Sequence, residues 1–454
     1  MSVRSLVAAL SVLCVGCTSV AEPRVNPRVA DPVVARAVAA VDEDRLGDDL
    51  AALVAFGTRH TRSDTTSDVR GIGAARRWLA DAFEQISGAH GGALVVTSQR
   101  HLVAPTARVP EPVELVNVVA TLPGSDPLRV IVVSGHYDSR NSSDADVTGD
   151  APGANDDGSG TVAVLETARA VLEALARDDA PRPRATIRFA CVAGEEQGLL
   201  GSRAMAADDR AAGLDVFAML TNDIVGGLEG GNGMPNRGRI RLFSEGVPSG
   251  DGAPPLTGSD NDAPSRQLAR AVAEIAQVHV PELAVELVFR QDRYLRGGDH
   301  KAYNEQGFAA VRLTDAFEHF DRQHQDVRVA DGRAFGDVLE HVDVAHLTEV
   351  TRLNAAVVLA LALAPPSPTG VSVDISGLSH DTRLAWDDPA DPTVAGYRVR
   401  LRATSEPTWT TVIDVGDAHE LVLPGVSKDD VLFAVEAYDA AGRTSIMVYP
   451  TPRR

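Results

Sequence analysis

Cysteine is scarce in this sequence, and its placement limits the covalent chemistry open to the chain. Among 454 residues there are three cysteines, and Cys14 and Cys17 lie in or at the end of an N-terminal apolar stretch. Once that stretch is removed, Cys191 remains alone, which excludes an intramolecular disulfide. Cys191 lies inside the apolar run "TIRFACVA", so we predict a core thiol and not a nucleophile.

Positive charge is also in deficit. The 43 lysine and arginine residues face 63 aspartate and glutamate residues, which gives a formal net charge of −20 at pH 7 without a long block of like charge. This balance argues against a nucleic-acid partner and for a soluble acidic surface. A hydrophobic content of 44% excludes a disordered chain and predicts more than one domain with a sizeable core.

The apolar run at the N-terminus is too short to cross a bilayer. It extends from Leu6 to Val15 after a basic residue, which is typical of a secretory signal, and we predict such a segment over residues 1–22. Gly16-Cys17 at its end resembles a bacterial lipobox, which implies membrane attachment through a lipidated Cys17. Cys14 departs from that pattern, because such signals usually carry Leu there. Two localisations therefore stay open: a lipoprotein of the bacterial cell envelope and a simply secreted protein.

The middle of the chain alternates between strand-like and helix-like patterns. The predicted strands are 129–134, 186–193, 216–221 and 308–314, and the main helical patterns are 72–86, 160–176 and 265–278. Continuous apolar strands separated by helices indicate an α/β domain with a mainly parallel or mixed sheet and helices on both faces. We expect this domain over residues 30–364. Such sheets bind ligands beyond the carboxyl ends of their strands.

A different pattern follows the prolines at 365 and 366. From about residue 371 onward, short alternating segments predict strands and turns, and we expect a small all-β sandwich over residues 369–454. Trp386, Tyr397 and Phe433 can supply its core. The segment resembles a fibronectin type III domain, which implies a spacer or adhesion role, and the sequence identifies no partner for it.

Titratable residues follow each predicted strand of the α/β domain. They are His136 and Asp138 in "GHYDSR", Asp156 in "APGANDDGSG", Glu195 and Glu196 in "GEEQGLLGS", Asp223 after "VFAMLT", and His319 and His324 after 308–314. Each one alone is explained by a turn, a helix cap or a solvated loop. Together they would repel one another unless a cation held them. Two histidines with several carboxylates suit zinc, and a bridging carboxylate would make a two-metal hydrolytic site.

The order of these motifs resembles the di-zinc aminopeptidases of clan MH, family 28 of the metallopeptidases. The matching segments are "HYDS", "PGANDDGSG", "GEEQGLLGS", "ND", "GGDHKAYNEQGF" and "RQHQDV", within roughly residues 45 to 364. The resemblance implies two Zn²⁺ ions. It assigns His136 and Asp223 to one ion, Glu196 and His324 to the other, and Asp156 to both.

The same resemblance implies two catalytic roles. Glu195 matches the general base that takes a proton from water, and Asp138 matches the aspartate that orients His136 through its far ring nitrogen. Tyr303 is a candidate donor for charge on the tetrahedral intermediate.

Four further residues bear on the predicted site. Asp299 and His300 match a pair near the family's substrate cleft, and His319 competes with His324 as a ligand, although "RQHQD" favours His324. Asn222 stands where many relatives carry an apolar residue, which puts local packing in question.

The resemblance implies a zinc aminopeptidase that removes N-terminal residues from peptides with a free N-terminus, and the N-terminal apolar segment predicts that it is exported. Two alternatives stay open: a zinc glutaminyl cyclase-like acyltransferase of the same fold, and a catalytically silent binding protein. A cyclase of that kind generally works with one zinc ion, and a silent protein typically loses ligands. The complete set of five candidate ligands favours hydrolysis.

Overall fold

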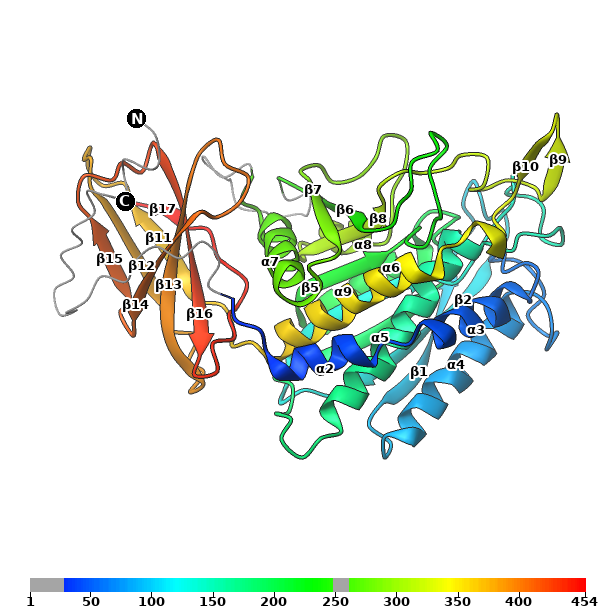
Figure 1. Ribbon diagram of the computed structural model, residues 1–454, viewed down its shortest axis with the longest axis horizontal. Helices are drawn as coiled ribbons and strands as arrows, with labels where there is room; N and C mark the ends of the chain where they lie inside the picture. Colours follow the sequence, from blue (N-terminus) through cyan, green and yellow to red (C-terminus); the bar gives the residue numbers. More distant parts are fainter. Residues whose placement is uncertain (1–27, 248–260) are drawn as a thin grey trace.

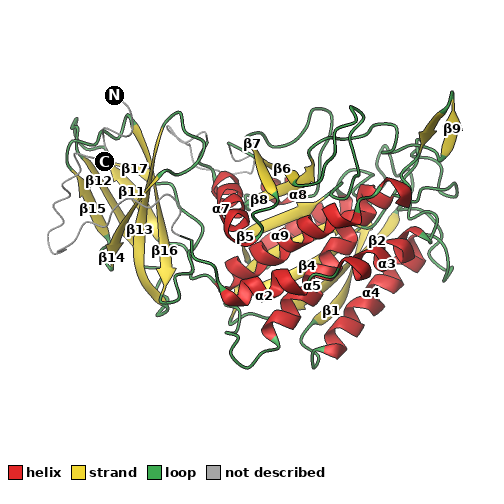
Figure 2. Cartoon of the chain, in the orientation of Figure 1, coloured by secondary structure: helices red, strands yellow, loops and turns green. Residues whose placement is uncertain are grey.

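The computed structural model describes residues 28–247 and 261–454, which form an α/β domain and a smaller β domain (Figures 1 and 2). The predicted signal segment, with Cys14 and Cys17, lies outside the described residues. Cys191 lies on a central strand, buried and free, as its apolar surroundings predict.

An eight-stranded mixed sheet forms the centre of the α/β domain. Its order is β1-β2-β4-β3-β5-β8-β6-β7. The strands are β1 (Val95–Val103), β2 (Val113–Leu122), β3 (Asp126–His136), β4 (Ala185–Val192), β5 (Asp215–Asn222), β6 (Arg239–Ser244), β7 (Ala284–Val288) and β8 (Ala310–Asp315). The four central strands β4, β3, β5 and β8 are parallel to one another, while β2 and β6 join them antiparallel. The predicted α/β fold with a mixed sheet is therefore confirmed.

Helices cover both faces of this sheet. The helices are α2 (Pro32–Ala40), α3 (Glu43–Val54), α4 (Ile72–Ala89), α5 (Gly160–Leu175), α6 (Leu200–Ala211), α7 (Pro264–His279), α8 (His300–Glu305) and α9 (Val344–Leu363). On β3, Ile131 and Val133 pack into the larger core with α4, α5 and α9, whereas Val130 and Val132 pack with α6 and α8. This alternation is what a strand buried on both faces requires.

Helix α9 is apolar and long enough to cross a membrane by composition, but it is a core helix here. In its most apolar stretch, 72% is buried inside the protein, and it packs against α5 and α2. Its N-terminus is capped by Asp343, whose carboxylate accepts from the backbone N–H groups of Ala345 and His346.

The parallel strands bring their carboxyl ends to one edge, where the predicted residues lie. His136 is the last residue of β3, and Asp223 directly follows β5. Helix α5 begins close to the end of β3, because Gly135 has no side chain: a Cβ there would lie 2.5 Å from the carbonyl carbon of Gly160. An irregular turn over Ala154–Ser159 leads into α5 at this point.

The β domain contains two small sheets packed face to face (Figure 1). Their orders are β15-β12-β11-β17 and β14-β13-β16. The strands are β11 (Thr369–Asp374), β12 (Thr382–Asp387), β13 (Val394–Ala403), β14 (Thr411–Gly416), β15 (Glu420–Leu423), β16 (Val431–Asp439) and β17 (Thr451–Arg453). Trp386, Tyr397 and Phe433 lie together in its core. The resemblance to a fibronectin type III domain stays a prediction.

Buried ion pairs join the two domains. Arg400 on β13 lies 3.0 Å from Glu436 in its own domain and 2.5 Å from Glu274 on α7. Arg402 lies 2.6 Å from Asp262, which precedes α7. Since the side chains of both arginines are at most 2% exposed, the β domain is docked against α7 by charged groups that have lost their water.

Candidate metal centre

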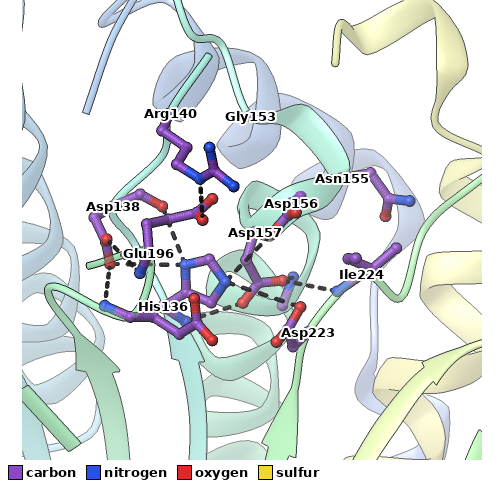
Figure 3. A network of polar contacts seen from close by, with 12 residues as sticks. His136, Asp138, Arg140, Gly153, Asn155, Asp156, Asp157, Glu196, Asp223 and Ile224 are labelled. Carbon is purple, nitrogen blue, oxygen red and sulfur yellow. Dashed lines mark hydrogen bonds and ion pairs between the residues drawn. The ribbon is translucent and has the colours of Figure 1, made fainter. Parts of the chain in front are cut away.

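Two clusters of possible metal ligands lie side by side at the carboxyl edge of the sheet. The first comprises His136, Asp156 and Asp223, whose nearest ligand atoms all lie within 4.8 Å of one another. His136 Nε2 is 3.3 Å from Asp156 Oδ1 and 3.9 Å from Asp223 Oδ1. All three residues are buried. Figure 3 shows His136, Asp156 and Asp223 close to one another.

The second cluster comprises Asp156, Glu196 and His324. His324 Nε2 is 3.0 Å from Asp156 Oδ2 and 3.0 Å from Glu196 Oε2. Asp156 therefore contributes one carboxylate oxygen to each cluster. The structure brings together all five residues that the sequence suggested as ligands, in the two groups that the resemblance implied.

Asp337, which no sequence motif singles out, positions Asp156. Its carboxylate accepts the backbone N–H groups of Asp156, at 2.7 Å, and Asn155. Burial raises the pKa of Asp337 to about 7, against the opposing effect of these two donors. Asp337 lies 181 residues after Asp156. No local motif could have identified it.

Asp157 connects three elements around the site. Its Oδ2 accepts the backbone N–H of His136 at 2.9 Å, and its Oδ1 accepts those of Gly160 at 3.0 Å and Ile224 at 3.3 Å. The carboxylate thereby ties the end of β3 to the start of α5 and to the residue after Asp223 (Figure 3). Its position beside Asp156 in "NDDG" was the available signal.

Asp138 orients His136 through its backbone carbonyl, whereas the resemblance implied an aspartate side chain. The nearest partner of His136 Nδ1 is the backbone carbonyl of Asp138, at 3.1 Å, while the carboxylate is 3.7 Å away. The carboxylate instead accepts the backbone N–H groups of Glu195 and Glu196, both at 3.2 Å. Asp138 therefore positions His136 with its main chain and the backbone of the two adjacent glutamates with its side chain. Figure 3 shows Asp138 with His136 and Glu196.

Two arginines contact the carboxylates of the clusters, and neither was predicted. Arg312 lies 2.9 Å from Asp223 Oδ1 and also pairs with Asp292 at 3.3 Å. Arg140 lies 2.9 Å from Glu196 Oε2. A charged residue inside the apolar run "FAAVRLT" was the signal for Arg312, because a lone charge in a buried strand requires a partner.

Glu195 lies beside the clusters and belongs to neither of them. It is half-buried. Burial raises its pKa well above the ordinary glutamate value; His136 opposes this effect, while Asp223, Glu196 and Asp299 reinforce it. A glutamate in such surroundings is a better proton acceptor than an exposed one.

The side chains of Asp299 and His300 lie in different surroundings, although the two residues are adjacent in the chain. Asp299 is 1% exposed, neither of its carboxylate oxygens has a hydrogen-bond partner among the described residues, and burial raises its pKa to about 6. His300 Nε2 is 2.9 Å from the carbonyl of Gln291, and burial lowers its pKa to about 4. Asp299 is thus an unpaired carboxylate near the clusters, and His300 is a neutral structural group.

Three other candidates find structural explanations. Tyr303 was expected as a donor at the site, but its hydroxyl donates to Asp209 at 3.0 Å within the core beneath α6 and α8, so this expectation is wrong. His319 belongs to neither cluster of the described residues. Asn222 pairs with Asn354 on α9 at 2.7 Å, which explains a polar residue where an apolar one was expected.

The side-chain atoms of the two clusters also fit a metal ion by their lack of hydrogen-bond partners and by their chemical type. His136 Nε2 and Glu196 Oε1 are buried and have no hydrogen-bond partner in the part of the chain that the structure describes. Buried polar atoms of this kind are rare without a missing partner. Imidazole nitrogens together with carboxylate oxygens are ligands that zinc prefers.

Comparison with known proteins places the chain among the metallopeptidases. The model of Peptidase family M28 matches residues 117–343. A probable zinc metalloprotease of Leptosphaeria maculans is 42% identical over 409 residues, covering 89% of this chain and 93% of the relative. Another, from Pyricularia oryzae, is 41% identical and covers 94% of this chain and 86% of the relative. The chain belongs to peptidase family M28, as its motifs predicted.

A solved structure supports the fold. The LapA aminopeptidase of Legionella pneumophila superposes with a TM-score of 0.53 at 20% sequence identity, over 73% of this chain and 74% of that chain. At this identity, the likeness concerns the fold alone.

Proposed function

We propose that this protein is a zinc-dependent aminopeptidase that uses two zinc ions. The observation that carries the proposal is the division of Asp156 between two ligand clusters, with one oxygen 3.3 Å from His136 and the other 3.0 Å from His324. A carboxylate shared in this way is typical of two-metal hydrolytic sites. The names of the curated relatives, each a probable zinc metalloprotease, support the choice of metal.

Each residue of the two clusters has a proposed role. His136 and Asp223 would hold one ion, Glu196 and His324 the other, and Asp156 both. When bound, the ions supply Lewis acidity and make water a stronger acid, which gives a nucleophile at neutral pH. Asp138 keeps His136 and the Glu195–Glu196 backbone in position.

Glu195 is proposed as the general base. It lies beside the ligands without belonging to a cluster, and its raised pKa suits a group that must accept and then return a proton near neutrality. It would take the proton of the attacking water and deliver it to the leaving amine.

Recognition of a free N-terminus is supported by the carboxylates around the site. Asp299 has no hydrogen-bond partner for either oxygen among the described residues; its charge raises the pKa of Glu195, and the charge of Asp223 raises the pKa of Asp299. A substrate α-ammonium would supply the missing donor to a buried anion. The preference for an exopeptidase over an endopeptidase rests on this match.

The competing functions differ in the number of clusters they need. A cyclase-like acyltransferase working with one ion does not require a second cluster, and a silent binding protein does not require Glu195. Here both clusters are complete among the described residues. Hydrolysis by two ions is therefore the better-supported function.

The test is mass spectrometry of a short peptide incubated with the zinc-loaded protein, once with a free N-terminus and once acetylated. Stepwise loss of N-terminal residues from the free peptide alone is the expected result. Internal cleavage of both peptides would indicate an endopeptidase. Loss of ammonia from a peptide with N-terminal glutamine, without hydrolysis, would indicate the cyclase.

We also propose that the protein is exported, because of the apolar segment from Leu6 to Val15. Expression of the full chain in a bacterial host, followed by intact-mass analysis of the N-terminus, tests this. A mature N-terminus at a lipidated Cys17 would establish a lipoprotein, cleavage nearby without lipid would establish secretion, and an unprocessed Met1 would contradict export.

A further inference from the structure

Arg59 is a fully buried arginine whose guanidinium bonds to the main chain next to the candidate metal centre. Its Nε donates to the carbonyl of Tyr137 at 2.7 Å, its Nη1 to that of Pro152, and its Nη2 to that of Gly153 at 2.9 Å. The planar guanidinium has donors in a fixed fork, so these bonds fix directions as well as distances. One side chain thus joins two separate segments of the chain.

The two segments that Arg59 joins each lead to a proposed metal ligand. Tyr137 directly follows His136, and Gly153 lies three residues before Asp156. The nearest ligand atoms of His136 and Asp156 are 3.3 Å apart. A shift of either segment would change this separation, and both residues belong to the same candidate ligand cluster.

The main chain of Arg59 contacts the same two segments. Its N–H donates to Ser139 Oγ at 3.0 Å, and its carbonyl accepts the N–H of Ser139 at 3.3 Å. The Ser139 hydroxyl donates in turn to the carbonyl of Ala151 at 2.7 Å, and Thr58 pairs with Ala151 in a parallel bridge. The chain around Arg59 therefore lies against both the segment after β3 and the segment before Asp156.

Gly153 allows the guanidinium to come this close. Its φ is +53°, and a Cβ atom there would lie 3.0 Å from Arg59 Nη2 and 2.7 Å from the carbonyl oxygen of Asp156. A side chain at this position would push the arginine away from the turn that carries Asp156. The glycine therefore permits the direct contact between Arg59 and this turn.

The charge of Arg59 is balanced by several carboxylates of the centre at a distance. The hydrogen-bond acceptors of its guanidinium in the described part of the chain are carbonyls. Burial lowers the pKa of Arg59 to about 10, and the charges of Asp337, Asp138, Asp157 and Asp156 oppose this effect. Arg59 is therefore a cation at neutral pH, and it offsets part of the repulsion among these buried carboxylates.

We propose that Arg59 positions the metal ligands by holding the segment after His136 and the segment before Asp156 at a fixed separation. It is a positioning residue, because its hydrogen bonds go to the main chain and not to a ligand side chain. The proposal rests on the proposed two-ion site. It adds to that site a residue that lies before the segment matched by the family model, which begins at residue 117.

Zinc affinity in Arg59→Lys, measured by competition with a chelator, tests the proposal. Lysine keeps the charge, but its donors all start from one nitrogen and cannot reproduce the fork. The variant should bind zinc about tenfold more weakly than the natural protein, the lower end of the range over which residues behind the ligands alter metal affinity. Both ions should be affected, because Asp156 belongs to both clusters.

The visible absorption of bound Co²⁺ provides a second readout. It depends on the number and arrangement of the ligands, so it reports the geometry of the centre without relying on turnover. The spectrum of cobalt-loaded Arg59→Lys should differ from that of the cobalt-loaded natural protein.

Arg129→Lys is the matched control. Arg129 is also buried and also donates to two carbonyls, those of Ala364 at 3.2 Å and Pro365 at 3.4 Å, but it lies near the opposite end of β3. Both lysine variants should lower the melting temperature of the metal-free protein, because each breaks hydrogen bonds of a buried guanidinium. Only Arg59→Lys should change the zinc affinity and the cobalt spectrum.

Ser139→Ala is a milder variant for the case in which Arg59→Lys does not fold. It removes the hydroxyl that accepts the N–H of Arg59 and donates to Ala151, so it weakens the same link by two hydrogen bonds. Zinc should bind to this variant less tightly than to the natural protein, by a smaller factor than that expected for Arg59→Lys. With Arg59→Lys unfolded, an unchanged zinc affinity in Ser139→Ala would overturn the proposal.

The outcomes distinguish this proposal from the proposed function. Natural zinc affinity and a natural cobalt spectrum in Arg59→Lys would overturn the positioning role and leave the aminopeptidase proposal standing. Equal weakening in Arg59→Lys and Arg129→Lys would overturn it as well, because the loss would then follow from lower stability alone. Zinc binding without cleavage of peptides would overturn only the aminopeptidase, and absence of zinc binding in the natural protein would overturn both proposals.

Discussion

The guanidinium of Arg312 lies 2.9 Å from Oδ1 of Asp223, and both side chains are at most 5% exposed. Arg312 is on β8 and Asp223 directly follows the neighbouring strand β5, so the pair links two parallel strands at the candidate metal centre. Asp292 contacts the same guanidinium at 3.3 Å. Two buried carboxylates thus share one guanidinium.

Replacing Arg312 by leucine should therefore destabilise the metal-free protein strongly. Loss of one partner of a buried pair typically costs about 3 to 5 kcal/mol, because the remaining charges stay buried and unpaired. Urea unfolding of metal-free protein measures this cost. The control is Arg239→Leu, which removes an ion pair with Glu286 whose side chains are 45% and 43% exposed and which should contribute at most about 1 kcal/mol. Equal losses in the two variants would contradict the prediction.

Removing the shared ligand should abolish metal binding. Asp156→Ala deletes one oxygen from each cluster, so neither ion keeps three ligands. Elemental analysis after dialysis should find little zinc in this variant, whereas Asp326→Ala, which deletes an exposed carboxylate bonded to Ser142, should keep it. Zinc should also raise the melting temperature of the natural protein alone, since a ligand at a thousand times its Kd adds about 4 kcal/mol. Full zinc content in Asp156→Ala would refute its bridging role.

The general base has its own test. Glu195→Gln keeps the shape of the side chain but cannot accept a proton, so kcat should fall by about 10²- to 10⁴-fold. Its zinc content and melting temperature should match those of the natural protein, because Glu195 belongs to neither cluster. Glu305→Gln is the control, since Glu305 pairs with Arg203 at the surface. Unchanged turnover in Glu195→Gln would sink the assignment.

The sheet could be predicted from the sequence only where its strands are buried on both faces. The central strands β3, β4, β5 and β8 appear as continuous apolar runs, because both of their faces meet helices. Strand β1 was missed: all of its residues are exposed or half-buried, and it pairs along one edge only. The short strand β7, also exposed or half-buried, was missed for the same reason.

The residues of the candidate metal centre also differ in whether the sequence alone could reveal them. The proposed ligands could be found because each follows an apolar strand or lies in a motif that resembles the family, such as "NDDG" at Asp156. Asp337 and Arg140 could not be found by that route. Asp337 contacts Asp156, from which it is 181 residues away along the chain, and Arg140 contacts His324, from which it is 184 residues away. Only the folded chain brings these residues together.

We expect the free energy of unfolding to depend on pH through His346. It lies on α9, its Nε2 is 3.2 Å from Asp315 Oδ1, and its Nδ1 is 3.8 Å from Glu349. Burial disfavours its charge, but the interactions with Asp315 and Glu349 outweigh burial and raise the pKa of His346 to about 9. The folded protein therefore holds a proton that the unfolded chain releases at about pH 6.5.

The direction of the pH dependence follows from the difference between the pKa of His346 in the folded and in the unfolded chain. A raised pKa stabilises the folded state fully below about pH 6.5, and this stabilisation is lost as the pH rises through about 9, a change of roughly 3 kcal/mol. Urea unfolding of the natural protein and of His346→Gln at pH 6, 8 and 10 measures it. The gap between the two proteins should be largest at pH 6 and smallest at pH 10. A gap that stays constant with pH would show that His346 is neutral in the folded protein and that its contact with Asp315 is an ordinary hydrogen bond.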